Sequence, residues 1–195
     1  MELKYRLMIF CLFFLALVFY VVVRYITLGF KPSKKMLEKA NKYFENSVAL
    51  ENSGDFEGVI KNLTKAIDIV DDKYEYYLFR SNAYMHLGTP NFTSAMDDVN
   101  YALTLKPDNI DLYLARASIN KEMGNLYMAY YDARHVCRIA PNVKNYIECA
   151  NIAVLMKDKG KILFELNNAL NLAKKIDDKK LIGLITEKIN KLNQT

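Results

Sequence analysis

Apolar residues recur along most of this chain three or four positions apart, which is the spacing of an amphipathic helix. After Pro32-Ser33 this pattern continues almost without a break. No stretch alternates apolar and polar residues as a strand does, and only seven glycines and four prolines interrupt the chain. The pattern therefore predicts an all-α protein.

The helical pattern itself repeats about every 34 residues. A small residue returns 36, 34 and 33 positions apart, as Ala66, Ala102, Val136 and Ala169. A second row of small residues consists of Ser47, Ser81, Ala117 and Ala150. A fixed period of this size predicts stacked helix pairs, each of which contacts only its neighbours. Gly54, Gly88 and Gly124 fall where the two helices of a pair would be joined by a tight turn.

One unit shows the pattern most clearly, with Tyr77, Arg80, Ser81, Tyr84, Leu87-Gly88, Phe92, Ala95, Ala102-Leu103, Leu105 and Pro107. In these residues the chain resembles the tetratricopeptide repeat (TPR) family, whose unit is two antiparallel helices. The resemblance implies a right-handed TPR-like solenoid over residues 40–176, with repeats at about 40–73, 74–109, 110–143 and 143–176. In the fourth unit Lys157-Asp158 replace the turn glycine.

The two ends of the solenoid have their own predicted elements. Residues 177–195 form an amphipathic pattern with Ile182, Ile185, Ile189 and Leu192 on one face, which predicts a C-terminal capping helix. Residues 31–39 are basic and predict a linker or the start of the first helix.

The first thirty residues differ from the rest, because residues 7–23 carry no charge. As a helix this run is about 25 Å long, near the lower limit for crossing a bilayer. We therefore expect residues 1–30 to be a single-pass transmembrane anchor that contacts the lipid bilayer through residues 7–23. More lysines and arginines follow the run than precede it, which favours the cytosolic side for the repeats. A cleaved signal peptide and a buried core helix are the alternatives.

In TPR folds the first helix of each unit lines a concave groove. Carried over by alignment, the resemblance implies a groove row of ten residues: Phe44, Val48, Leu78, Asn82, Met85, Leu114, Ser118, Lys121, Ile147 and Asn151. Apolar side chains beside amides suit an extended or helical peptide, whose backbone the amides can bind. The alternative is that this row is core, covered by residues 30–39 or by the last helix.

The remaining chemistry of the sequence excludes several function classes. The net charge of +5 includes no concentrated basic patch, so we expect no nucleic-acid partner. His86 and His135 stand alone, and Asp97-Asp98 and Asp177-Asp178 are expected to be caps or solvated faces. Without a phosphate loop or nucleophile motif, we expect no enzyme activity, no cofactor and no metal.

Two further features concern specific residue types. Cys137 and Cys149 are predicted to be buried free thiols, with a disulfide between them as the alternative. Chaperone-docking TPR proteins clamp a terminal carboxylate with cationic and amide side chains. None of those side chains occurs at the corresponding positions here, which hold Phe44, Val48, Phe79, Asp111 and Ala115.

Taken together, the sequence predicts a membrane-anchored TPR adaptor or scaffold that binds a protein or peptide in its concave groove. One alternative is an extracytoplasmic accessory protein of envelope assembly or secretion. A second is a preprotein import receptor on an organelle membrane.

Overall fold

The computed structural model describes residues 14–20 and 32–194. The chain forms two compact units, residues 1–38 and residues 39–195. The described residues contain helices and turns and no strand. The predicted all-α class is therefore confirmed for this part of the chain.

The structure corrects the predicted membrane localisation. Of the predicted span at residues 7–23 it describes only residues 14–20, which are helical. Among residues 14–20 and 32–194 no helix is long and apolar enough to cross a membrane. The single-pass localisation is therefore wrong, and the predicted lipid contact has no support; the rest of the predicted anchor lies outside the described residues.

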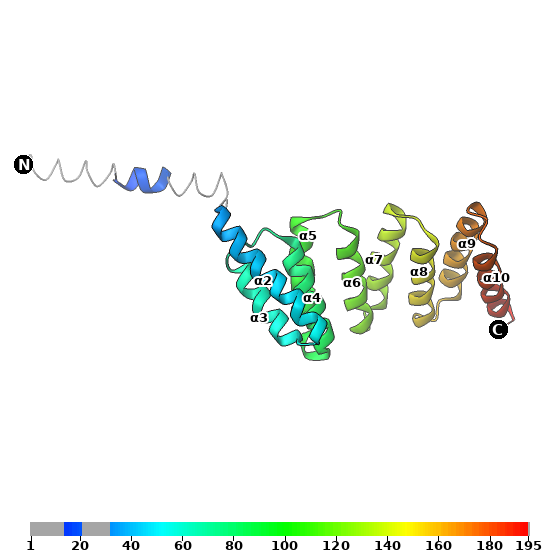
Figure 1. Cartoon of the computed structure of the whole chain (residues 1–195). Helices are drawn as coiled ribbons and strands as arrows, with labels where there is room; N and C mark the ends of the chain where they lie inside the picture. The colour runs from blue at the N-terminus through cyan, green and yellow to red at the C-terminus, as the bar shows by residue number, and fades with distance from the viewer. Residues whose placement is uncertain (1–13, 21–31, 195) are drawn as a thin grey trace, which may run out of the picture. The chain divides into compact units, whose positions relative to one another are not determined.

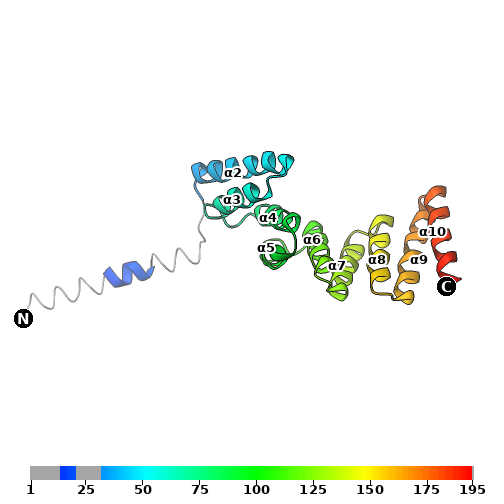
Figure 2. The same cartoon turned by 90° about the horizontal axis from the view of Figure 1, so that it is seen from below.

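The second unit is a row of helices that follow one another in chain order (Figures 1 and 2). Four antiparallel pairs are followed by one more helix. Their bounds are α2 Lys34–Ser53 with α3 Phe56–Ile67, α4 Tyr74–Leu87 with α5 Phe92–Leu105, α6 Ile110–Glu122 with α7 Leu126–Ile139, α8 Val143–Leu155 with α9 Lys159–Lys175, and α10 Lys179–Asn193. A single 3-10 turn, η1 at Thr89–Asn91, lengthens the connection between α4 and α5.

The turns within the pairs share a residue with a positive φ. Gly54, Gly88 and Gly124 have φ of 78°, 85° and 78°, a left-handed region that glycine enters at no steric cost. In the fourth pair Lys157 adopts φ 56° at the equivalent place. The absence of glycine therefore did not prevent this turn from forming.

Several helix starts are capped by a short polar side chain that accepts a hydrogen bond from a backbone amide three residues on. Asp55 does so for α3, Asn109 for α6, Asn142 for α8 and Asp158 for α9. Asp178 caps α10 in the same way, as the sequence predicted for Asp177-Asp178.

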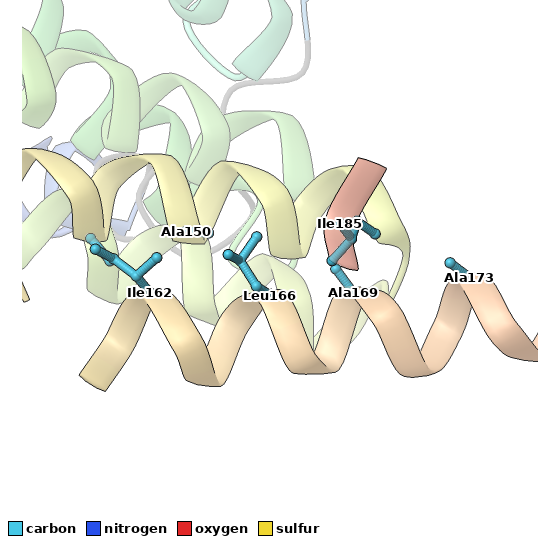
Figure 3. Packing of buried hydrophobic residues seen from close by; sticks show 7 residues of the cluster. Ala150, Ile162, Leu166, Ala169, Ala173 and Ile185 are labelled. Atoms are coloured by element: carbon cyan, nitrogen blue, oxygen red, sulfur yellow. The ribbon is translucent and has the colours of Figure 1, made fainter. Parts of the chain in front are cut away.

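The core runs along the row between successive helices. The structure buries the recurring small residues almost completely, so the helices approach closely: Ala66, Ala102, Val136 and Ala169 in one row, and Ser47, Ser81, Ala117 and Ala150 in the other. At the end of the row, Ile162, Leu166, Ala169 and Ala173 lie along one face of α9, with Ala150 of α8 and Ile185 of α10 beside them (Figure 3). Helix α10 thus covers the apolar face of the last pair.

Candidate functional site

The ten residues of the groove row lie on the first helices of the pairs, α2, α4, α6 and α8, and none of them is fully buried. Val48 and Leu114 are 38% and 37% exposed, although both are apolar. Asn82, Ser118 and Asn151 are exposed as well. The row is therefore accessible to a ligand along its length.

A first hollow of about 400 Å³ lies between α4 and α6. It is lined by Glu51, Asn82, Met85, His86, Phe92, Ala115, Ser118 and Glu122. Three of these residues belong to the groove row, namely Asn82, Met85 and Ser118. The hollow combines an apolar floor with amide, hydroxyl and carboxylate groups.

A second hollow of about 230 Å³ lies between α6 and α8. Its lining consists of Leu114, Ala117, Ser118, Lys121, Ala133, Lys144, Asn145, Glu148 and Ile152. Ser118 lines both this hollow and the first. The Lys121 Nζ atom lies 3.6 Å from Glu148 Oε1, so one charge of each sign is already paired here.

A third hollow of about 460 Å³ lies between α8 and α10. It is lined by Ala150, Asn151, Val154, Ile162, Leu166, Lys188, Lys191 and Leu192. Asn151 is its only member of the groove row. The sequence did not predict that α10 lines a hollow beside the groove row.

Three apolar members of the row also take part in packing. The Phe44 ring lies against Tyr76 and Phe79, with ring centroids 5.4 and 5.5 Å apart. Leu78 packs on the buried cluster that contains Tyr77, and Ile147 packs on the cluster at the end of the row. These three side chains therefore contribute to the packing between helices.

Sequence reasoning missed a set of buried ion pairs behind the groove. Arg80 of α4 donates two hydrogen bonds to the Asp98 carboxylate of α5, at 2.8 and 2.7 Å, and a third to Thr64 of α3 at 2.9 Å. Asp98 is only 6% exposed, so it is not the solvated residue that the sequence predicted. Burial raises the pKa of the Asp98 carboxyl, and the hydrogen bonds from Arg80 oppose that rise.

The same arrangement recurs one pair later. Arg116 of α6 donates to both oxygens of Asp132 in α7, at 2.9 and 2.8 Å, and to Asn100 of α5 at 3.3 Å. The hydrogen bond to Asp132 raises the pKa of the Arg116 guanidinium. The arginines are 36 positions apart and the aspartates 34, so a charge recurring at the period of the core residues was the signal available in the sequence.

In the fourth pair, the buried carboxylate has different hydrogen-bond partners. Cys149 stands where the arginine is expected, 33 positions after Arg116. The carboxylate of Glu165, fully buried on α9, instead accepts hydrogen bonds from Tyr130 at 2.5 Å and Arg134 at 3.1 Å, both on α7. The cation therefore comes from the preceding helix pair.

The two histidines and the two described cysteines each contact a neighbouring side chain. His86 stacks on Phe56 at 4.3 Å, and His135 accepts a hydrogen bond from Arg138. Cys137 and Cys149 are buried free thiols with their Sγ atoms 3.2 Å apart. Within residues 14–20 and 32–194 no three metal-ligating side chains come together.

No family model matches the chain. Rat serine/threonine-protein phosphatase 5 is 30% identical over 126 residues, which is 63% of this chain, whereas the chain spans only 23% of that enzyme's length. The match therefore concerns a minor part of the phosphatase.

Solved structures share the fold at lower identity. The first TPR of Spaghetti (RPAP3), bound to an HSP90 peptide, is 23% identical with a TM-score of 0.57, covering 62% of this chain and 98% of that one. MamA from Desulfovibrio magneticus RS-1 is 16% identical with a TM-score of 0.64, covering 82% and 97%. The row of helix pairs from α2 to α10 therefore has the tetratricopeptide-repeat fold.

Proposed function

We propose that this protein is an adaptor that holds a peptide segment of a partner protein against the groove row. The observation that carries the proposal is the exposure of Val48 and Leu114, two apolar side chains that a core would bury. They lie beside exposed amides and hydroxyls that can bind a peptide backbone. The fold it shares with a TPR bound to an HSP90 peptide supports the same kind of use.

The chemistry of the bound segment differs from that of a clamped terminal carboxylate. The five positions that would form such a clamp hold Phe44, Val48, Phe79, Asp111 and Ala115. None of these side chains is cationic, and one is an acid. We therefore propose an internal, partly apolar segment as the ligand.

The test is the double variant Val48→Asp with Leu114→Asp in the full chain. Both side chains are exposed, so we expect the melting temperature to stay within about 3 °C. Proteins captured by the unmodified chain should be lost from the variant, because an apolar ligand would have to cover and desolvate the new carboxylates. Leu78 is less suitable, because its contacts with the core would confound the result.

The matched control is Tyr127→Asp with Tyr131→Asp on α7. These tyrosines are 77% and 64% exposed and lie outside the groove row. The control should retain the captured proteins. The proposal fails if the control and the groove variant lose the same proteins, or if the groove variant unfolds and so shows that the row is core.

A further inference from the structure

The three hollows along the groove row differ in charge. In the first hollow the acidic residues are Glu51 and Glu122, and no lysine or arginine lines it. Neither carboxylate has an ion-pair partner among the described residues. The α4–α6 end of the groove therefore carries two uncompensated negative charges.

The third hollow has the opposite sign. Its charged residues are Lys188 and Lys191 of α10, and no acid lines it. In the part of the chain that the structure describes, neither ammonium group forms an ion pair. The floor beneath them is apolar, formed by Val154, Ile162 and Leu166 among others. This end suits an apolar side chain next to a carboxylate.

The second hollow lies between the two in charge as well as in position. Its Lys121 and Glu148 neutralise each other at 3.6 Å, which leaves Lys144. The net charge of the lining residues thus changes along the row from two negative charges through one positive charge to two positive charges. Complementary potentials of this kind fix the register and direction of a bound partner more than they raise its affinity.

We propose that the groove selects a bipolar peptide segment of its partner. A lysine or arginine of the segment binds between Glu51 and Glu122, and an apolar residue followed by aspartate or glutamate binds at Lys188 and Lys191. This inference rests on the proposed adaptor function and names the chemistry of the ligand. Two steps between neighbouring helices span roughly 20 Å, or about six residues of extended peptide.

The experiment uses four synthetic peptides of equal length with blocked termini and a neutral spacer of about six residues. The first, bipolar peptide has lysines at one end and leucine with glutamates at the other. The second has lysines at both ends, the third has glutamates at both ends, and the fourth is neutral. We expect the full chain to bind the bipolar peptide about fivefold more tightly than any other at low salt. The difference should shrink as salt screens these exposed charges.

Charge reversal in the protein supplies the sharper test. The variant Lys188→Glu with Lys191→Glu should prefer the peptide with lysines at both ends. The variant Glu51→Lys with Glu122→Lys changes the opposite end and should prefer the peptide with glutamates at both ends. The matched control is Lys179→Glu with Lys180→Glu, which makes the same charge change at the far end of α10, outside the third hollow.

The outcomes separate this inference from the adaptor proposal. If all four peptides bind equally, or only the control shifts the preference, the bipolar ligand is refuted while binding in the groove still stands. If the bipolar peptide does not bind measurably, the bipolar ligand is likewise refuted. The adaptor proposal is judged separately, by the Val48 and Leu114 variant.

Discussion

At the scale of single residues, Ser81 stands out because its Oγ atom is buried and has no hydrogen-bond partner among the described residues. The next two pairs carry Ala117 and Ala150 at this position. Because an unpaired buried hydroxyl is destabilising, Ser81→Ala should raise the free energy of unfolding by about 1 kcal/mol. Urea denaturation of the full chain measures the change.

Ser47 provides the matched control for that substitution. It is equally buried, but its Oγ donates a hydrogen bond to the Tyr43 carbonyl at 2.9 Å. Ser47→Ala removes this hydrogen bond, so it should raise the free energy of unfolding less than Ser81→Ala does. Equal gains at both positions would show that the unpaired hydroxyl is not the cause.

Loss of the Arg116 side chain should destabilise the protein strongly. Its partner Asp132 is completely buried, so Arg116→Met leaves an uncompensated charge in the core. We expect a loss of about 3 kcal/mol in the free energy of unfolding, measured with urea.

The double variant Arg116→Met with Asp132→Leu tests the cause of that loss. It removes both charges and should recover most of the lost stability. Arg138→Met, at an exposed arginine without a carboxylate partner among the described residues, should change little. A double variant as unstable as the single one would contradict this explanation.

These ion pairs also show where sequence reasoning stopped. The small residues and the apolar spacing predicted the helix pairs, because both are local patterns with a fixed period. Arg80 and Asp98 are 18 positions apart on two helices, so their recurrence at the repeat period marks each residue but does not show that the two form a pair. The side chains that form the third hollow could not be predicted either, because they depend on how α10 packs.

At the scale of elements, the α8–α9 turn is built with a residue poorly suited to it. Lys157 has φ 56°, and a left-handed conformation costs a residue with a Cβ atom roughly 1–2 kcal/mol. Lys157→Gly removes that strain but adds flexibility to the unfolded chain. We expect a net gain of about 0.5 kcal/mol, measured as a higher urea midpoint.

Gly124→Ala is the reciprocal substitution in the α6–α7 turn. A Cβ at this glycine would meet no atom within 4 Å, so any loss comes from its φ of 78° and not from a clash. It should destabilise the protein by about 1 kcal/mol. A neutral result there would show that the turns tolerate any residue, and would remove the reason to expect a gain at Lys157.

At the scale of the whole row of helices from α2 to α10, each helix pair contacts only its neighbours. A destabilising substitution should therefore affect mainly the helices close to it. Ile185 of α10 is 1% exposed within the terminal cluster. Ile185→Ala should cost about 2–4 kcal/mol there. In native-state hydrogen exchange, amides of α9 and α10 should lose protection while those of α4 and α5 change little.

Leu184→Ala serves as the control on the same helix, because Leu184 is 49% exposed. It should leave exchange nearly unchanged. An equal loss of protection from α4 to α10 after Ile185→Ala would instead mean that the row unfolds as one cooperative unit.

The carboxylate of Glu165 limits how such a chain can be rearranged during evolution. Its cation, Arg134, belongs to the preceding pair, whereas the equivalent positions of the first and second pairs hold Thr64 and Asn100. A recombination event that joined α8 and α9 to either of those pairs would bury an acid with no counter-charge. Helices α7, α8 and α9 must therefore be inherited as one block, although the repeat pattern suggests freely exchangeable modules.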